Sequence, residues 1–195
     1  MLISIDGSIG SGKSELIKRL QTLGYDTIPE PVDEWKKYLE AFYTNPERYA
    51  FLFQMKILIS QMTFSPDPEQ ITITERSSYT CRQIFVEMLK EEKLLNDLEI
   101  DLYDHYIQYF SQEPDTIVYI KTSPEICLQR IKQRNRDSEH LITLEYLTKL
   151  HNKHEAMLSK HDKVIIINGE QPPDTVFKDV VKALKLFPCG PNLLY

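Results

Sequence analysis

The 195-residue chain is poor in cysteine and glycine and lacks a long apolar run. Its three cysteines, Cys81, Cys127 and Cys189, form no C-x-x-C pair, so their spacing indicates neither a zinc site nor a redox pair. Six glycines and eleven prolines exclude a collagen-like or low-complexity chain. The most apolar segment, residues 49–62, is interrupted by polar side chains, and a bilayer-spanning helix needs about 20 apolar residues. We therefore expect a globular protein with no membrane partner.

Basic residues are fewer than acidic ones. The chain has 23 lysines and arginines and 29 aspartates and glutamates, which gives a net charge of −6. A protein that coats nucleic acid needs a basic surface, so we expect no nucleic-acid partner. The first residues, Met1 to Asp6, already have a strand pattern and leave no room for a signal or transit peptide. We expect a reducing compartment, the cytoplasm or the nucleus.

Short apolar or β-branched segments alternate with longer helical patterns. Helices are expected near residues 13–23, 33–42, 46–62, 78–92, 96–112, 124–134, 144–158 and 173–185. The strand candidates are Leu2–Asp6, Asp26–Pro29, Gln70–Thr74, Thr116–Lys121 and Lys163–Ile167. Such alternation predicts an α/β fold with a parallel sheet, as a single domain over residues 1–195. Asn45 and Ser123 precede prolines and are predicted helix caps, and residues 187–195 are expected to be a loosely packed tail.

A phosphate-binding loop follows the first predicted strand and opens the first predicted helix. The pattern G-x-x-x-x-G-K-[ST] is matched by Gly7, Ser8, Ile9, Gly10, Ser11, Gly12, Lys13 and Ser14. Glycines let the backbone curl so that its N–H groups face phosphate oxygens, next to the positive end of a helix. Lys13 is expected to bridge the β- and γ-phosphates, and Ser14 to offer its hydroxyl to Mg²⁺. We infer that the chain binds a nucleoside triphosphate.

Two acidic positions at predicted strand ends are candidates for the chemistry, because strand ends line the ligand crevice of a parallel sheet. Glu30 can accept the proton of an attacking hydroxyl, although an exposed loop glutamate is an open alternative. Trp35, the single tryptophan, offers a face for stacking a nucleobase or is simply core. Glu75 and Arg76 can hold Mg²⁺ through water and orient a hydroxyl, or can form a structural ion pair.

A buried amide and an arginine cluster complete the candidates. Gln54 lies in a helix that is apolar around most of its circumference, so its amide needs a partner, either a base edge or a backbone group. Arg130 and Arg134 share a helix face and Arg136 lies at the helix end. Such a cluster can neutralise charge on a triphosphate, and a solvated basic helix end is the alternative. The guanine-reading motif N-K-x-D is absent, which weakens a GTPase interpretation.

In this order and spacing the motifs resemble the deoxynucleoside kinase family, which includes deoxycytidine, deoxyguanosine, mitochondrial thymidine and insect multisubstrate kinases. The similarity runs from Met1 to about Leu158. It is carried by D-G-S-I-G-S-G-K-S, E-P-V-D-E-W, F-Y-T-N-P-E-R-Y-A-F-L-F-Q, T-E-R-S, R-Q-I-F-V-E, K-T-S-P-E-I-C-L-Q-R-I-K-Q-R-N-R and L-E-Y-L-T-K-L-H-N-K-H-E. The resemblance implies a three-layer P-loop fold with a five-stranded parallel sheet, and usually a homodimer. It also implies transfer of the ATP γ-phosphoryl group, with Mg²⁺, to the 5′-hydroxyl of a deoxynucleoside in nucleotide salvage.

Carried over by motif position, the resemblance gives Glu30 the role of general base. It implies that Arg76 contacts the 5′-hydroxyl and that Glu75 serves the Mg²⁺ shell. Tyr43 and Glu139 would hold the 3′-hydroxyl.

The resemblance also assigns the base and the lid. Gln54 would read the base, with the aromatic side chains of Phe85 on one side and of Trp35 and Phe53 on the other. The lid, about residues 130–140, would carry Arg134 and Arg136 to the phosphates. Arg130 would stack on the adenine of ATP.

Two positions depart from deoxycytidine- and purine-type members, which resemble one another in an acid–arginine pair. This chain has Cys81 and Gln61 there. A small neutral residue at position 81 is similar to the thymidine-accepting members, although a polar residue at position 61 is not. Thymidine, deoxycytidine or both are therefore the expected substrates. A thymidylate-type nucleoside-monophosphate kinase and an ATP-dependent binding module remain the alternatives.

Overall fold

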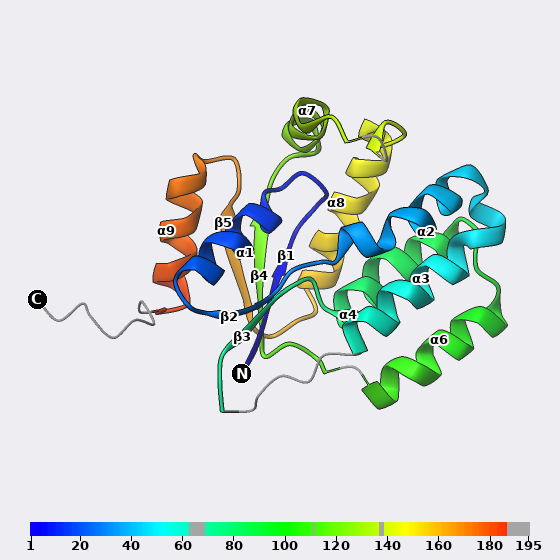
Figure 1. The fold of residues 1–195 in the computed structure, drawn as a ribbon, viewed down its shortest axis with the longest axis horizontal. Coiled ribbons are helices and arrows are strands. Elements are labelled where there is room, and N and C mark those ends of the chain that lie inside the picture. The colour runs from blue at the N-terminus through cyan, green and yellow to red at the C-terminus, as the bar shows by residue number, and fades with distance from the viewer. Residues whose placement is uncertain (63–68, 111, 137–138, 187–195) are drawn as a thin grey trace, which may run out of the picture.

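The computed structural model describes residues 1–62, 69–110, 112–136 and 139–186, and its strands form one parallel sheet (Figure 1). The order is β2-β3-β1-β4-β5, which confirms the predicted α/β fold. The strands are β1 (Leu2–Asp6), β2 (Asp26–Ile28), β3 (Thr72–Glu75), β4 (Thr116–Lys121) and β5 (Val164–Asn168). Ile5 pairs with Glu75 on one side and with Val118 on the other, so the loops after β1 and β3 leave the sheet side by side.

The helices follow the predicted segments closely, with one difference inside the predicted helix 78–92. Residues Cys81–Val86 form a π-helical segment, η1, between two short α-helices. A π segment inserts an extra residue into a helix and is frequent at functional sites. The helices are α1 (Lys13–Thr22), α2 (Val32–Thr44), α3 (Pro46–Met62), α4 (Ser78–Thr80), α5 (Glu87–Glu91), α6 (Asp97–Phe110), α7 (Pro124–Arg134), α8 (Leu144–Leu158) and α9 (Pro173–Ala183).

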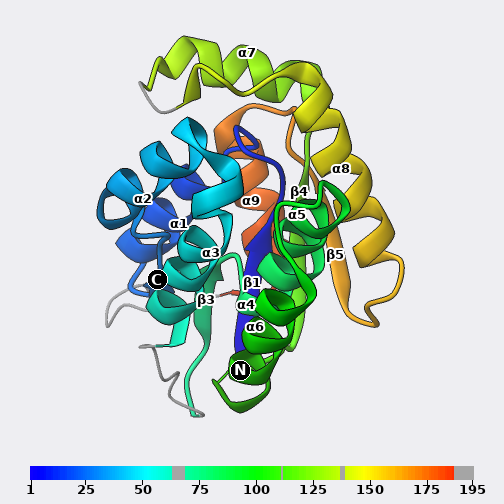
Figure 2. The same ribbon diagram turned by 90° about the vertical axis from the view of Figure 1, so that its right-hand side faces the viewer.

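Both faces of the sheet are covered, which explains why its central strands are nearly continuous apolar runs. Successive side chains of a strand point to opposite faces. Val118 and Ile120 of β4 join the core under α1 and α9. Ile117 and Tyr119 of the same strand join the core under η1 and α8. Figures 1 and 2 show these two helical layers, with α2, α3 and α6 beyond the second one.

Both predicted helix starts are confirmed in position. The Asn45 side-chain oxygen accepts a hydrogen bond from the backbone N–H of Arg48 at 3.2 Å. Ser123 is the N-cap residue of α7 with Pro124 at the first helical position, although its side chain makes no capping hydrogen bond. The predicted tail, 187–195, lies outside the described residues, as do residues 137 and 138 of the predicted lid. Among the described helices, none has the length and apolar character to cross a membrane.

The chain order creates a switch point at the carboxyl edge of the sheet. From β1 the chain crosses through α1 to the β2 side, whereas after β3 it leads on to β4 on the opposite side. Ligands of open α/β sheets bind where neighbouring strands send the chain in opposite directions. The site is therefore expected between the ends of β1 and β3, below α7 in the view of Figure 1.

Candidate active site

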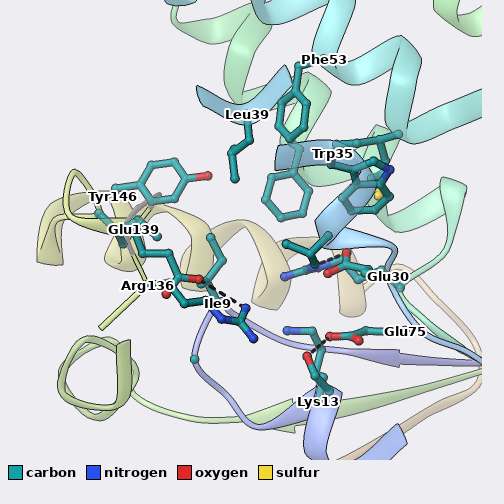
Figure 3. A pocket seen from close by; sticks show the side chains of 18 of the residues that line it. Ile9, Lys13, Glu30, Trp35, Leu39, Phe53, Glu75, Arg136, Glu139 and Tyr146 are labelled. Atoms are coloured by element: carbon teal, nitrogen blue, oxygen red, sulfur yellow. Dashed lines mark hydrogen bonds and ion pairs between the residues drawn. The ribbon is translucent and has the colours of Figure 1, made fainter. Parts of the chain in front are cut away.

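A cavity of about 420 Å³ opens at this switch point. Almost all the predicted site residues line it: Ile9, Gly10, Gly12, Lys13, Ser14, Glu30, Trp35, Tyr43, Phe53, Gln54, Glu75, Arg76, Cys81, Phe85, Arg130, Arg134, Arg136 and Glu139. Figure 3 shows Glu30, Glu75 and Lys13 near one end of the cavity. Arg136, Glu139 and Tyr146 lie on the other side, and Trp35 and Phe53 above. Gly7, Ser8, Ser11 and Gln61 are the predicted residues that do not line this cavity.

The phosphate loop is shaped by glycines and holds unused hydrogen-bonding groups. Gly10 has φ +85°, and a Cβ there would lie 2.6 Å from the backbone oxygen of Cys127, so only glycine fits. Lys13 Nζ donates to the backbone oxygen of Ser8 at 2.9 Å. Among the described residues, the buried hydroxyls of Ser8 and Ser11 have no hydrogen-bond partner. Burial, followed by the positive charge of Arg76, lowers the pKa of Lys13 to about 8. The loop is therefore a cradle suited to an anion. A bound anion would accept hydrogen bonds from the unpartnered hydroxyls and would favour the charged form of Lys13.

Ser14 and Glu75 meet directly beside the loop. The Ser14 hydroxyl donates to Glu75 Oε1 at 2.6 Å, and Glu75 is the last residue of β3. Hard oxygen atoms of this kind are the ligands that Mg²⁺ prefers, together with water and substrate phosphates. In the described part of the chain, no group of three metal-ligating side chains gathers.

Glu30 and Arg76 form a buried ion pair in the cavity wall. Arg76 Nη1 donates to Glu30 Oε1, and their side chains are only 7% and 12% exposed. Glu30 is therefore not an exposed loop glutamate. Burial lowers the pKa of Arg76, but the charge and hydrogen bond of Glu30, together with Cys81 and Glu75, raise it overall.

The backbone of Arg76 is strained, with φ +60°, a conformation that costs energy for a residue other than glycine. Its N–H donates to Ile5 at 3.1 Å, and its guanidinium carbon lies 5.1 Å from the ring centre of Phe85. Three neighbouring elements thus fix this arginine at the end of β3.

An aromatic chamber lies above the ion pair. Trp35 and Phe53 are buried and pack with Phe85 and Cys81. Gln54 is 3% exposed, and its side-chain oxygen is buried without a hydrogen-bond partner among the described residues. Within the described ranges, no backbone group therefore serves as the partner of this oxygen. A buried carbonyl without a partner costs about 1–3 kcal/mol, which a ligand that donates a hydrogen bond would recover.

The arginine cluster is partly exposed, with the side chains of Arg134 and Arg136 at 32% and 50% exposure, but each member has a protein partner. Arg134 donates to the Glu139 carboxylate twice, from Nε at 2.7 Å and from Nη2 at 2.5 Å. Arg136 Nη1 lies 3.8 Å from the same carboxylate. Arg130 donates to the backbone oxygens of Ser11, at 3.4 Å, and Gly169, at 3.0 Å. Arg130 therefore ties α7 to the phosphate loop and to the loop after β5.

Gln61 lies behind the chamber, in the wall of a second cavity of about 280 Å³. Its assignment to substrate binding stays a prediction, since Gln61 does not line the main cavity but contacts Cys81, which does. Gln61 Nε2 donates to Cys81 Sγ at 3.5 Å. Burial raises the pKa of the Cys81 thiol to about 12, so the group facing the chamber is neutral.

Sequence reasoning missed Tyr146, which projects into the cavity from α8 beside Glu139 (Figure 3). Burial, followed by the nearby Tyr43, raises the pKa of Tyr146. Burial and Glu139 raise the pKa of Tyr43 to about 12. Tyr43, Glu139 and Tyr146 are therefore one cluster of neutral phenols around a carboxylate. The signal that could have identified Tyr146 is its helical spacing. It lies one residue before the buried Leu147 and four residues before the buried Leu150, so it shares their side of α8.

Comparison with known proteins agrees with this geometry. The family model described as deoxynucleoside kinase matches residues 3–187. Protein 143R of Invertebrate iridescent virus 6 is 34% identical over 192 residues, covering 95% of this chain and 97% of its own. Human deoxycytidine kinase is 33% identical over 193 residues, covering 80% and 74%.

A solved structure of deoxyadenosine kinase from M. mycoides, with products dCMP and a flexible dCDP bound, has the same fold. It superposes with a TM-score of 0.82 at 23% identity and covers 95% of this chain and 98% of its own. The family match spans nearly the whole chain, and it includes every element that contributes to the cavity. The chain belongs to the deoxynucleoside kinase family.

Proposed function

We propose that this chain transfers the γ-phosphoryl group of ATP to the 5′-hydroxyl of a pyrimidine deoxynucleoside in nucleotide salvage. The observation that carries the proposal is that Glu30 opens on the same cavity as the phosphate loop. Lys13 and the loop are suited to the triphosphate, and the aromatic chamber is suited to the base. Glu30 lies between these two ends, where an acceptor hydroxyl has to be activated.

In this mechanism Glu30 accepts the proton of the 5′-hydroxyl as that oxygen attacks the γ-phosphorus. A new bond forms between the 5′-oxygen and the γ-phosphorus, and the bond to the β–γ bridging oxygen breaks, so that ADP leaves. Arg76 orients the acceptor and holds Glu30. Lys13, Arg134 and Arg136 stabilise the charge on the phosphoryl oxygens, which is the main catalytic contribution in phosphoryl transfer.

Other residues of the cavity are proposed to bind Mg²⁺ and the adenine of ATP. Ser14 and Glu75 would hold Mg²⁺, which when bound neutralises charge between the β- and γ-phosphates. Arg130, whose guanidinium lies between the phosphate loop and the loop after β5, would offer its face to the adenine of ATP.

A pyrimidine is the proposed base. Trp35, Phe53 and Phe85 supply flat faces, and the Gln54 oxygen can accept a hydrogen bond from a ring N–H or an exocyclic amine. Cys81 is small and neutral, which leaves space for a 5-methyl group. We therefore expect thymidine, deoxycytidine or both to be substrates.

The direct test is a panel of acceptors with ATP and Mg²⁺. Thymidine, deoxycytidine, deoxyadenosine and deoxyguanosine are compared with thymidine monophosphate and with no acceptor. We expect the largest kcat/KM for a pyrimidine deoxynucleoside and a 5′-monophosphate as product. Turnover of the monophosphate alone would indicate a thymidylate-type kinase, and slow ATP hydrolysis that ignores every acceptor would indicate a binding module.

We also propose that the chain is a homodimer. Six exposed apolar side chains gather on α3 and α6, which pack against each other: Leu52, Ile59, Leu98, Leu102, Tyr106 and Tyr109. Leu98 is 82% exposed and Tyr109 is 70% exposed, and large apolar side chains exposed on two adjacent helices support an interface there. Sedimentation equilibrium is expected to give a dimer mass, and Leu98→Asp to shift it toward the monomer. A monomer mass for the unaltered protein would contradict this.

The chain is proposed to act as one domain in a reducing compartment, the cytoplasm or the nucleus. The support is that Cys81 and Cys127, the described cysteines, are both buried and free.

A further inference from the structure

An arginine near the start of η1 contacts two carboxylates outside this π-helical segment. Arg82 donates to both side-chain oxygens of Asp104 in α6, from Nε to Oδ1 and from Nη2 to Oδ2, the second at 2.8 Å. Its Nη1 lies 3.6 Å from Oε2 of Glu87, the first residue of α5. The Arg82 side chain is 17% exposed. A two-pronged contact of a mostly buried arginine fixes geometry in a way that a single exposed ion pair does not.

The contact between Arg82 and Glu87 depends on the π-helical register. Residues five apart in an α-helix lie about 140° apart around the helix axis. In a π-helix each N–H bonds to the carbonyl five residues earlier, so residues five apart return to nearly the same side. Arg82 lies in η1 and Glu87 directly follows it. Their contact therefore favours the π-helical register over a continuous α-helix, in which the two side chains would point to different sides.

Asp104 connects this register to a neighbouring helix. Tyr103 of α6 belongs to the same apolar cluster as Val86 of η1 and Leu89 of α5, and Figure 2 shows α5 and α6 close together. The residue after Tyr103 is Asp104, which accepts from Arg82. Arg82 therefore joins η1 both to α6 and to the residue that follows η1.

The segment held in this way supplies one wall of the aromatic chamber. Cys81 and Phe85 of η1 line the main cavity and pack with Trp35. Arg82 and Asp104 are both described, and neither lines the cavity. An effect of these two residues on ligand binding therefore has to pass through η1.

We propose that Arg82 and Asp104 are positioning residues for nucleoside recognition. Their contact holds η1 in the π-helical register, and this register sets where Cys81 and Phe85 lie in the chamber wall. Loss of the contact lets η1 shift and weakens the packing around the base. The phosphate loop belongs to other elements and keeps its shape. The inference rests on the proposed function, in which the chamber takes the base.

The first test compares Asp104→Ala with Asp101→Ala, which removes an exposed carboxylate from the same helix. We expect Asp104→Ala to raise the calorimetric Kd of thymidine or deoxycytidine about 3- to 30-fold, the range for substitutions that act on a ligand through packed neighbours. The Kd of a non-hydrolysable ATP analogue with Mg²⁺ should stay within about 2-fold, and Asp101→Ala should leave both constants within the same limit.

The single tryptophan gives a second readout that needs no ligand. Trp35 is buried and packs in one cluster with Phe85, so a shift of η1 admits water to its ring and moves its fluorescence emission to longer wavelength. Asp104→Ala and Arg82→Gln should both show this change, and Asp101→Ala should not. A general loss of stability would lower the melting temperature without moving the emission of the folded protein.

The double variant Arg82→Gln/Asp104→Ala shows whether the two residues act through one contact. Because each single change breaks the same contact, the double variant should weaken nucleoside binding no more than the stronger single variant does. If Asp104→Ala does not fold, Glu87→Gln removes the other carboxylate that contacts Arg82, at a partly exposed position, and takes its place with the same expectations.

The outcomes distinguish this inference from the proposed function. Equal losses of affinity for nucleoside and ATP analogue would overturn the inference, as would effects of the two single changes that multiply in the double variant. Unchanged emission and unchanged nucleoside affinity would also overturn it. If the unaltered protein binds no deoxynucleoside, the proposed function fails, whereas the emission still decides whether Arg82 and Asp104 position the chamber wall.

Discussion

Glu30→Gln is expected to lower kcat about 100-fold or more, the scale of a positioned general base, while KM for the deoxynucleoside changes little. The substitution keeps the size of the side chain and a hydrogen-bond acceptor for Arg76, but it removes the proton acceptor at the 5′-hydroxyl. An effect on kcat without an effect on KM means that the lost interaction belongs to the transition state. Steady-state kinetics with a pyrimidine deoxynucleoside measure both constants.

The control for this variant is Glu34→Gln. Glu34 is a mostly exposed glutamate of α2, paired only at the surface with Lys56, so its loss of charge should leave kcat within about 2-fold. Because Glu30 is paired with the buried Arg76, thermal unfolding of Glu30→Gln is measured alongside. A folded variant with near-normal kcat would remove Glu30 from the role of base.

Gln54→Leu is expected to weaken deoxynucleoside binding by about 5- to 150-fold, the equivalent of about 1–3 kcal/mol for a base edge left without its partner. The ATP analogue should bind within about 2-fold of the unaltered protein, since Gln54 belongs to the aromatic chamber rather than to the phosphate loop. Calorimetric Kd values for both ligands measure the difference.

Gln54→Leu should also not destabilise the fold, because it replaces a buried oxygen that has no partner among the described residues with an apolar group of similar size. Gln21→Leu, on the exposed end of α1, is the matched control and should leave both affinities unchanged. Equal losses for nucleoside and ATP would show that Gln54 supports the fold of the cavity and does not read the base.

Much of the fold follows from local sequence. Parallel strands covered on both faces are short apolar runs, so β1 and β4 were predicted within a residue. The bounds of α3 were predicted from the Asn45–Pro46 start and the long apolar run that follows it. The phosphate loop was predictable because its geometry depends on a few consecutive residues. The position of Gly10, where a Cβ would meet the Cys127 backbone at 2.6 Å, shows why that pattern tolerates little change.

The remaining features depend on tertiary contacts that no short window contains. The predicted helix 78–92 gave no sign of its π segment, because a register change of this kind is set by what the helix packs against. The hydrogen bond from the Ser123 backbone N–H to Glu170 joins residues distant in sequence, so no local pattern indicates it. Tyr146 lines the cavity because the fold brings α8 beside it, which the helical pattern of α8 does not show.

The central claim is that the carboxylate of Glu30 reaches the 5′-hydroxyl of a sugar that lies between the phosphate loop and the aromatic chamber. A crystal structure with a pyrimidine deoxynucleoside and a non-hydrolysable ATP analogue tests this most directly. We expect a Glu30 oxygen within hydrogen-bond distance of the 5′-oxygen, which in turn faces the γ-phosphorus, with the base against Gln54. A nucleoside bound elsewhere, with the Glu30–Arg76 pair turned away from it, would contradict the account.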